Sequence, residues 1–394
     1  MHVAAAVAGI KVLQVLPTLC AGGAEGFVAN LCVSLADQGA ETRVFLLAGV
    51  RGTRGLVLQK RLEQAGVRIV GIEARSIRSP STLLRLSRLI RSWAPDIVQA
   101  NLFAGEIACV AARVLALRPR VRYARRLANT MQSHLRADVV VRFLDRSFHL
   151  VIANSPAVAS AYSEFTRGHG DTRLVTIPNG GHLLSSVPTS DEKQRARDVL
   201  GVPRHVYVVA HIGSMFPGRT LGRGLETAQK AHDVLLRAFS EAFGAGSKAL
   251  LLSVGDGPLR KDIEELAQRL ELQARVKFLG ELPEPWPVLK AADVFFFPSR
   301  YEGLPNVLPE AASCGLPVIA SDIPEIRGIF EEGVWTLEPP DDVGRFAHAL
   351  RDGWERRDEL ARRASAAAPE FRERFSMERC AERYLQAYQA VLWS

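Results

Sequence analysis

Short apolar runs alternate with longer helical patterns along almost the whole of this 394-residue chain, and this alternation limits the fold more than any other feature. Strands that alternate with helices form a parallel sheet with helices on both faces. A chain of this length has room for two such domains. We therefore expect an α/β protein of two doubly wound, Rossmann-like domains that face each other across a cleft. The strands are predicted at residues 12–16, 42–47, 67–71, 96–100, 121–124 and 150–154 in the first half, and at 207–212, 249–255, 276–279, 294–297 and 317–320 in the second.

The segment 179–203 separates the two series of strands and is rich in glycine, serine, proline and charged residues. We place the hinge there, with an amino-terminal domain at 1–183 and a carboxy-terminal domain at 184–374. After Asp341 the periodicity is helical to the end of the chain. Leu385, Tyr388, Leu392 and Trp393 give the last helix, at 375–394, an apolar face.

Composition excludes several classes of protein. Hydrophobic residues make up 47% of the chain, which is typical of a globular protein. The five cysteines are scattered and form no Cys-x-x-Cys or Cys/His cluster, so we expect a reducing cytosol and no zinc site. No apolar run reaches transmembrane length, and Lys11 closes the mildly apolar start, so we do not expect a signal peptide.

Positive charge is concentrated in the first half of the chain. Residues 1–183 hold 23 Lys/Arg and 11 Asp/Glu, a net charge of +12, whereas the remainder holds 27 and 31, a net charge of −4. A solvated surface is one explanation for this asymmetry. Contact with an anionic membrane, an acidic acceptor or nucleic acid is another, although no basic-aromatic platform for nucleic acid is visible.

Glycine-containing loops follow four of the predicted strands, at 16–25, 212–214, 255–258 and 301–306. Ligands of doubly wound sheets bind beyond the carboxyl ends of the strands. Four such loops at one cleft favour a nucleotide site.

The segment 301–310 is the most informative of these loops. It lies between the predicted strand 294–297 and a short helix that ends at Gly315. Loop amides and the start of that helix favour an anion, most simply a phosphate. Glu302 and Glu310 flank this position, and their carboxylates can accept hydrogen bonds from hydroxyl groups, such as those of a ribose and a sugar.

These motifs resemble those of the retaining glycosyltransferases of family 4, which have the GT-B fold. The resemblance runs from about residue 10 to the carboxyl terminus and is strongest over 254–321. The segments that carry it are GGAE at 22–25, NS at 154–155, IPNG at 177–180, QKAHDVLLRAF at 229–239, VGDGPLR at 254–260, VKFLG at 276–280, PSRYEGLPNVLPEA at 298–311 and CGLPVIAS at 314–321.

The resemblance implies a role for each matching residue. Glu310 would hold the ribose of a nucleotide-sugar donor, Glu302 would face the sugar, and Lys230 would bind phosphate, with Glu302 and Lys230 as the catalytic pair. The amides of Gly303, Leu304 and Asn306 would bind the diphosphate, and the backbone at Leu279 would contact the base. Gly22 and Gly23 would approach the donor from the other domain, onto which the last helix would cross back.

The chain departs from the family pattern at several donor-site positions. Ser214 stands where an arginine often binds phosphate, and an insertion at 216–227 separates it from Lys230. Arg219 or Arg223 in this insertion could replace the missing charge as part of a lid, or the insertion could be a surface loop. Asn101, like Gln99, stands where many members have histidine, and Arg126 lies near the place of a cleft histidine.

The expected chemistry needs no metal and no separate cofactor. A lysine, loop amides and a helix start can stabilise the charge that develops on a leaving phosphate. The chain contains no Asp-x-Asp motif, the usual metal-binding motif of the alternative glycosyltransferase fold. In the resembling family the leaving phosphate assists the acceptor on the same face, which retains configuration.

We therefore expect a hexosyltransferase that uses a UDP- or GDP-sugar and acts on a lipid-linked or polysaccharide acceptor. It would work in the cytoplasm, at the inner face of the cell membrane. The alternatives are a nucleotide-sugar epimerase of the same fold and a catalytically weak scaffold protein. The stripe of Leu83, Leu84, Leu86, Leu89, Ile90 and Trp93, interspersed with arginines, either lies on an anionic membrane or packs on its own sheet.

Overall fold

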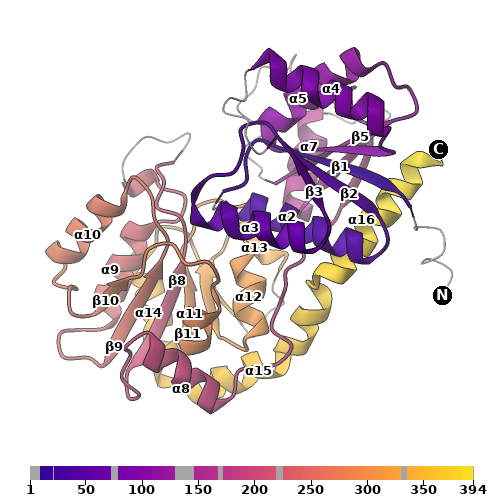
Figure 1. Ribbon diagram of the computed structural model, residues 1–394. Coiled ribbons are helices and arrows are strands. Elements are labelled where there is room, and N and C mark those ends of the chain that lie inside the picture. The colour runs from indigo at the N-terminus through magenta and orange to yellow at the C-terminus, as the bar shows by residue number, and fades with distance from the viewer. Residues whose placement is uncertain are drawn as a thin grey trace. The chain divides into compact units, whose positions relative to one another are not determined.

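The computed structural model describes residues 9–20, 22–71, 79–128, 146–166, 172–218, 225–329 and 335–393. The chain forms two compact units. Unit 1 comprises Met1–His182 together with Phe375–Ser394, and unit 2 comprises Leu183–Arg374. Each unit contains one parallel sheet with helices packed on it, so the expected pair of doubly wound domains is confirmed (Figure 1).

Unit 1 is built on a seven-stranded sheet in the order β3-β2-β1-β4-β5-β6-β7. The order reverses between β1 and β4, where a doubly wound sheet has its topological switch point. Its strands are β1 (Lys11–Leu16), β2 (Glu41–Leu46), β3 (Arg68–Val70), β4 (Ile97–Asn101), β5 (Arg122–Leu127), β6 (Leu150–Ala153) and β7 (Arg173–Thr176). Its helices are α2 (Gly23–Asp37), α3 (Gly52–Gln64), α4 (Pro80–Trp93), α5 (Leu102–Ala116), α7 (Pro156–Thr166) and α16 (Met377–Leu392).

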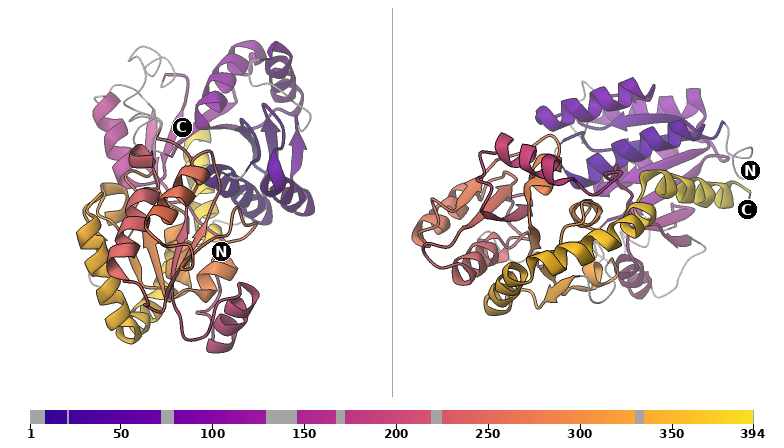
Figure 2. Two further views of the ribbon diagram at one scale, coloured as in Figure 1. Left: turned by 90° about the vertical axis from the view of Figure 1, so that its left-hand side faces the viewer. Right: turned by 90° about the horizontal axis from the view of Figure 1, so that it is seen from below.

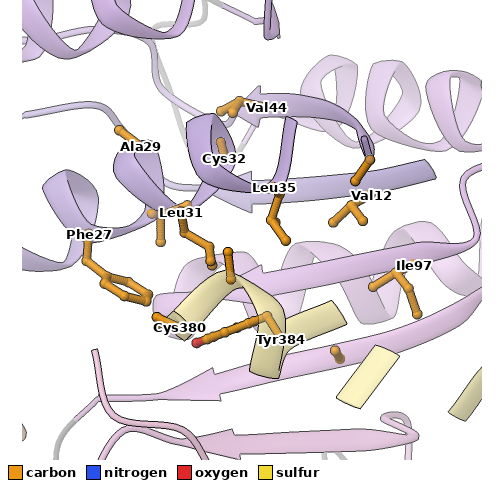
Figure 3. Close-up of a cluster of buried hydrophobic side chains, with 14 of the residues drawn as sticks. Val12, Phe27, Ala29, Leu31, Cys32, Leu35, Val44, Ile97, Cys380 and Tyr384 are labelled. Carbon is orange, nitrogen blue, oxygen red and sulfur yellow. The ribbon is translucent and has the colours of Figure 1, made fainter. Parts of the chain in front are cut away.

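Both faces of the unit 1 sheet are buried because successive side chains of a strand point to opposite sides. Val12 and Leu16 of β1 pack with α2, α3 and α16, whereas Leu13 and Val15 pack with α4 and α5. Figure 3 shows part of the first cluster, in which Tyr384 of α16 lies among side chains of α2 and the sheet. The terminal helix is therefore part of the core of unit 1, and Figure 2 shows it in yellow against this unit.

Helix α4 settles the two alternatives for its apolar stripe. Leu86, Ile90 and Trp93 are buried against the sheet, and Leu83 and Leu89 pack partly on the same cluster. Only Leu84 among these residues is exposed. The structure therefore bears out the alternative in which the stripe packs on its own sheet, and it leaves Leu84 and the arginines of α4 at the surface.

Unit 2 repeats the same sheet order with six strands, β10-β9-β8-β11-β12-β13, and its switch point lies between β8 and β11. Its strands are β8 (Tyr207–Ile212), β9 (Ala249–Val254), β10 (Val276–Phe278), β11 (Val294–Phe297), β12 (Val318–Ser321) and β13 (Thr336–Glu338). Its helical elements are α8 (Ser190–Val199), η2 (Leu225–Thr227), α9 (His232–Ala242), α10 (Arg260–Arg269), α11 (Trp286–Ala291), α12 (Val307–Ser313), α13 (Pro324–Arg327), α14 (Val343–Glu355) and α15 (Arg357–Arg374).

Two edge strands, β7 and β13, were not predicted from the sequence. Neither contains a fully buried residue, so neither shows the apolar run that marks the inner strands. Among the described residues, no helix combines the length and the apolarity that crossing a membrane requires.

Candidate functional site

The switch point of unit 2 brings together two loops that are far apart in the sequence. One follows β8 and begins with Gly213 and Ser214; the other follows β11 and extends to Asn306, where α12 begins. Both loops leave the carboxyl ends of neighbouring parallel strands, which is where ligands of such sheets bind.

Lys230 and Glu302 meet at this position although they are 72 positions apart in the chain. The Lys230 Nζ donates to Glu302 Oε1 at 2.5 Å, and Ser299 Oγ donates to the same oxygen at 2.6 Å. The side chains of Lys230 and Glu302 are only 15% and 6% exposed, so their charges attract each other with little screening. The ammonium group also lies 4.7 Å from the ring centroid of Phe297 at the end of β11.

Arg300 fixes the chain segment that carries Lys230. Its guanidinium forms two hydrogen bonds with the Asp233 carboxylate, at 3.1 and 2.8 Å, and a third with Asp341 at 2.7 Å. It also donates to the carbonyls of Leu225 and Ala228. Arg300 and Asp233 were not predicted as site residues from the sequence, although they lie two and three residues from Glu302 and Lys230 in the segments 298–311 and 229–239.

Gln229 adds a backbone connection between the same two segments. Its carbonyl accepts hydrogen bonds from Ser299 Oγ at 2.8 Å and from the Arg300 amide at 2.9 Å. Its side-chain amide donates to the Tyr301 carbonyl at 2.9 Å. The positions of Lys230 and Glu302 are therefore set by one continuous hydrogen-bond network.

Two buried histidines lie beneath the pair. His211 at the end of β8 and His232 at the start of α9 are both 0% exposed, and their rings lie edge to face with centroids 5.0 Å apart. His211 Nδ1 hydrogen-bonds with the Phe296 carbonyl at 3.0 Å. Burial lowers the pKa of His211 to about 4 and also lowers the pKa of His232, so both rings are neutral at neutral pH. They act as uncharged packing beneath Lys230.

The glycine loops after β8 and β9 pack backbone against backbone. Gly255 has a φ of +134°, and a Cβ there would lie 1.9 Å from the Gly213 carbonyl oxygen. A Cβ at Gly257 would lie 2.4 Å from the Met215 carbonyl oxygen. These glycines allow the loops to approach closely, which is a structural reason for this part of the glycine pattern.

The remaining predicted residues of unit 2 also lie at carboxyl ends of strands. Leu279 follows β10 and is half-buried, and Ser214 is exposed after β8. Within the described residues, the amides of Gly303 and Leu304 take part in no backbone hydrogen bond. Asn306 is the N-cap of α12, and Glu310 lies partly buried in its first turn. Arg219 and Arg223 lie outside the described residues.

The predicted residues of unit 1 include the glycine pair at the start of α2. Gly22 is the N-cap of this helix, and a Cβ there would lie 2.1 Å from a carboxylate oxygen of Glu25. The Glu25 carboxylate is buried and accepts a hydrogen bond from the Cys20 thiol at 3.3 Å. Gly22 therefore leaves room for an acidic group that turns back over the helix start, where its charge is favourable. Gly23 begins α2.

Asn101 and Arg126, the two proposed cleft residues, have partners inside unit 1. Asn101 Nδ2 donates to Gln14 Oε1 at 2.8 Å, and its side chain belongs to a buried polar network beneath α16. Arg126 donates to Asn179 Oδ1 at 2.7 Å and lies 4.4 Å from the ring centroid of Phe27. Both residues are at most 2% exposed and have polar partners inside unit 1, and Arg126 Nε alone of these named groups is buried with no partner among the described residues.

Comparisons with known proteins agree with this arrangement. Residues 22–180 match the family model of the glycosyl transferase 4-like domain, and residues 219–355 match that of glycosyl transferases group 1. The chain is 28% identical over 382 residues to the lipopolysaccharide core biosynthesis glycosyltransferase LpsD of Rhizobium meliloti, covering 93% of this chain and 95% of that protein.

Two further similarities concern a shorter segment and the fold. The chain is 30% identical over 152 residues to an Escherichia coli enzyme named UDP-Gal:alpha-D-GlcNAc-diphosphoundecaprenol alpha-1,3-galactosyltransferase, covering 38% of this chain and 37% of that enzyme. The crystal structure of Anabaena Alr3699/HepE in complex with UDP and glucose superposes with a TM-score of 0.79 at 20% identity. The superposition covers 97% of this chain and 100% of the Alr3699/HepE chain. At 20% identity, this similarity shows a shared fold only.

Proposed function

The chain belongs to the glycosyltransferases of the GT-B fold, with a glycosyl transferase 4-like domain in unit 1 and a glycosyl transferases group 1 domain in unit 2. We propose that it transfers a sugar from a nucleoside diphosphate sugar to a lipid-linked or glycan acceptor in cell-envelope polysaccharide assembly. The observation that carries the proposal is the Lys230–Glu302 pair at the switch point of the unit 2 sheet.

The donor binds to unit 2 in this proposal. Its diphosphate lies against the amides of Gly303, Leu304 and Asn306 and accepts a hydrogen bond from Lys230. The base contacts the backbone at Leu279, and the ribose hydroxyls donate to Glu310. UDP is the preferred nucleotide, because a structural neighbour was solved with UDP and glucose and the name of a relative specifies a UDP-sugar.

The two residues of the pair act on different parts of the donor. In the donor-free protein the Lys230 ammonium is held by Glu302. A bound diphosphate offers this ammonium a second anion, and its attraction strengthens as the bond from the sugar carbon to the phosphate oxygen breaks and charge develops on that oxygen. The Glu302 carboxylate, oriented by Ser299, then accepts a hydrogen bond from a sugar hydroxyl.

The transfer step proceeds with retention of configuration and without a metal ion. The acceptor hydroxyl oxygen bonds to the sugar carbon on the face that the phosphate leaves. The electron pair of the broken bond stays on the phosphate oxygen, which takes the proton of the acceptor hydroxyl. The products are the glycosylated acceptor and the protonated nucleoside diphosphate. Lys230 and the amides of the loop before α12 supply the positive potential that a cation would otherwise provide.

The acceptor is proposed to be lipid-linked or polysaccharide, at the inner face of the cell membrane. The name of one relative specifies lipopolysaccharide core biosynthesis, and that of another specifies a diphosphoundecaprenol substrate. The excess positive charge of residues 1–183 is consistent with an acceptor presented on an anionic surface.

Glu310→Gln tests the donor assignment. Glutamine keeps the shape of the side chain but weakens its charge-assisted hydrogen bonds to ribose, so UDP affinity measured by calorimetry should fall roughly tenfold to a hundredfold. Glu265→Gln, on the exposed side of α10, is the matched control. Unchanged affinity in Glu310→Gln would remove the ribose role, and parallel titrations with GDP and UDP identify the preferred base.

A further inference from the structure

Helix α5 is apolar on both its inner and its outer side. Ala108, Cys109, Ala112 and Ala116 are buried against the sheet and α4. On the other side, Ile107, Val114 and Leu115 are 48%, 67% and 45% exposed. Positions 107, 111, 114 and 115 of α5 recur at the spacing of one helical face, so Ile107, Val114 and Leu115 form a continuous exposed stripe. A helix that is apolar on opposite sides is normally buried on both, whereas in the part of the chain that the structure describes the outer stripe of α5 is exposed.

Leu117 extends the apolar stripe beyond the end of the helix. It is the C-cap of α5, has a φ of 50°, and is 78% exposed. A left-handed conformation is unfavourable for leucine, and glycine is the usual residue at such a helix end. An exposed leucine at this position has an unfavourable backbone conformation and leaves an apolar side chain in water. Insertion of the side chain into an apolar environment would remove the second of these two costs.

Exposed arginines lie on α4 and directly after α5, and neither of these two helices carries an exposed acidic residue. Arg85, Arg88 and Arg91 are exposed on α4, which packs beside α5 on the same face of the sheet (Figure 1). Arg118 and Arg120 are exposed directly after α5, and Arg118 donates to the Arg91 carbonyl at 2.8 Å, which joins the ends of the two helices. Helix α4 contains no acidic residue, and the one acidic residue of α5, Glu106, is buried beside Arg125.

We propose that this α4–α5 face, formed by Leu84, Ile107, Val114, Leu115, Leu117 and the five arginines, docks on an anionic phospholipid bilayer. The apolar stripe of α5 enters the boundary between headgroups and acyl chains, and the arginines pair with lipid phosphates. An apolar helix face bordered by basic residues only is the pattern of interfacial helices on anionic membranes. The inference extends the proposed function by stating which surface brings the enzyme to a lipid-linked acceptor.

Vesicle co-sedimentation of the full-length protein tests the proposal. The parent should bind vesicles of phosphatidylcholine with phosphatidylglycerol, bind pure phosphatidylcholine weakly, and lose part of its binding in high salt. The triple variant Val114→Ser/Leu115→Ser/Leu117→Ser should bind the anionic vesicles at least about tenfold more weakly, since three apolar side chains no longer gain from insertion. Replacing Arg85, Arg88 and Arg91 with glutamine should remove most of the salt-sensitive part.

The matched control is Leu56→Ser/Val199→Ser, which removes two exposed apolar side chains, 60% and 80% exposed, from α3 and α8. It should bind vesicles like the parent, and thermal melting should show all variants folded. Equal binding by the triple variant and the parent, or no binding by the parent, would overturn the proposal. The proposal would also be overturned if the parent were a dimer, the triple variant were a monomer, and both bound vesicles equally. The face would then be an interface between two copies of the protein.

UDP calorimetry without vesicles separates this inference from the proposed function. The triple variant should bind UDP like the parent, since its substitutions lie in unit 1 and the proposed donor residues named above for the nucleotide lie in unit 2. Loss of vesicle binding with intact UDP binding supports the docking face, whereas absent UDP binding in the parent contradicts the donor assignment alone.

Discussion

The carboxylate of Glu302 receives two donors on one oxygen, and this arrangement defines what the residue can do. Lys230 and Ser299 donate to Oε1, so a bound sugar hydroxyl would donate to the other oxygen or replace one of these partners. The carboxylate is thereby oriented before any donor arrives. Such orientation reduces the reorganisation needed during reaction.

Glu302→Gln should separate catalysis from nucleotide binding. Glutamine can still accept the hydrogen bond of Ser299, but it no longer holds the Lys230 ammonium by charge, so Lys230 remains available to phosphate. We expect turnover to fall roughly tenfold to a hundredfold, from the loss of a charge-assisted hydrogen bond, while UDP affinity is kept or increases. Steady-state kinetics and calorimetry measure the two effects, and unchanged turnover would remove Glu302 from the mechanism.

The buried His211 makes stability depend on pH in one direction. Its pKa is about 4 in the folded protein and 6.5 in the unfolded chain, because burial disfavours the charged ring. Above pH 6.5 both states are uncharged and the residue contributes no pH dependence. Between pH 6.5 and 4 the unfolded state takes up the proton and the folded state does not, so stability falls as the pH falls, by about 1.4 kcal/mol for each unit of the pKa difference.

His211→Asn should reduce this pH dependence. Asparagine can still donate toward the Phe296 carbonyl but does not titrate. The fall in melting temperature between pH 6.5 and 4 should therefore be smaller in His211→Asn than in the parent. His205→Asn, which changes an exposed histidine of the same unit, is the control. Equal slopes in parent and His211→Asn would show that this ring does not govern the acid sensitivity.

At the scale of elements, α16 is held to the unit 1 sheet by a buried polar network as well as by apolar packing. Tyr388 Oη donates to Gln99 Oε1 at 2.6 Å and accepts from Gln14 Nε2 at 3.2 Å. Gln14 and Gln99 lie on β1 and β4, the two strands at the switch point, and Asn101 completes the network. The polar residues that replace the family's histidines at 99 and 101 thus have a structural role, which is to bind the last helix of the chain.

Tyr388→Phe should destabilise unit 1 by roughly 1–3 kcal/mol, because it leaves buried side-chain amides without a partner. Tyr384→Phe is a close control, since Tyr384 is equally buried one turn earlier and makes no hydrogen bond with Gln14, Gln99 or Asn101. Thermal melting should show a lower transition for Tyr388→Phe and a small change for Tyr384→Phe. Equal shifts in the two variants would mean that the network adds nothing to packing.

At the scale of the whole molecule, the proposals place nucleotide binding in unit 2 and membrane contact in unit 1. The proposed donor residues of unit 2 and the apolar, basic face of unit 1 are built on separate sheets. Donor activation can therefore rely on a single set of fixed groups, namely Lys230 and the loop amides before α12.

Sugar transfer should survive chelation of divalent metals. Lys230 and backbone amides are proposed to stabilise the charge on the leaving phosphate. EDTA should therefore change the rate at which UDP is released in the presence of acceptor by less than about twofold, because loss of a contact made in the transition state would slow the reaction much more. Assays of UDP release with and without EDTA measure this rate. Loss of activity that Mg²⁺ or Mn²⁺ restores would contradict the metal-free mechanism.

The sequence by itself determined the inner strands, the repetition of two doubly wound sheets and the segments around Lys230 and Glu302. These features depend on local apolar periodicity and on short motifs, which are visible in adjacent residues. The edge strands β7 and β13 lacked that periodicity because they are only partly buried.

Only the tertiary structure decided which polar groups are partners and which apolar groups remain exposed. The contacts of Arg300 with Asp233 and of Tyr388 with Gln99 join residues 67 and 289 positions apart, and no local pattern encodes such pairs. The apolar stripe of α4 was predicted either to face a membrane or to pack on the sheet, and most of it packs on the sheet. The exposed apolar stripe lies on α5. This helix has apolar residues on two sides, so its sequence does not indicate which side the sheet covers. The physical reason is that burial is a property of the neighbours that surround a side chain, and the fold alone supplies those neighbours.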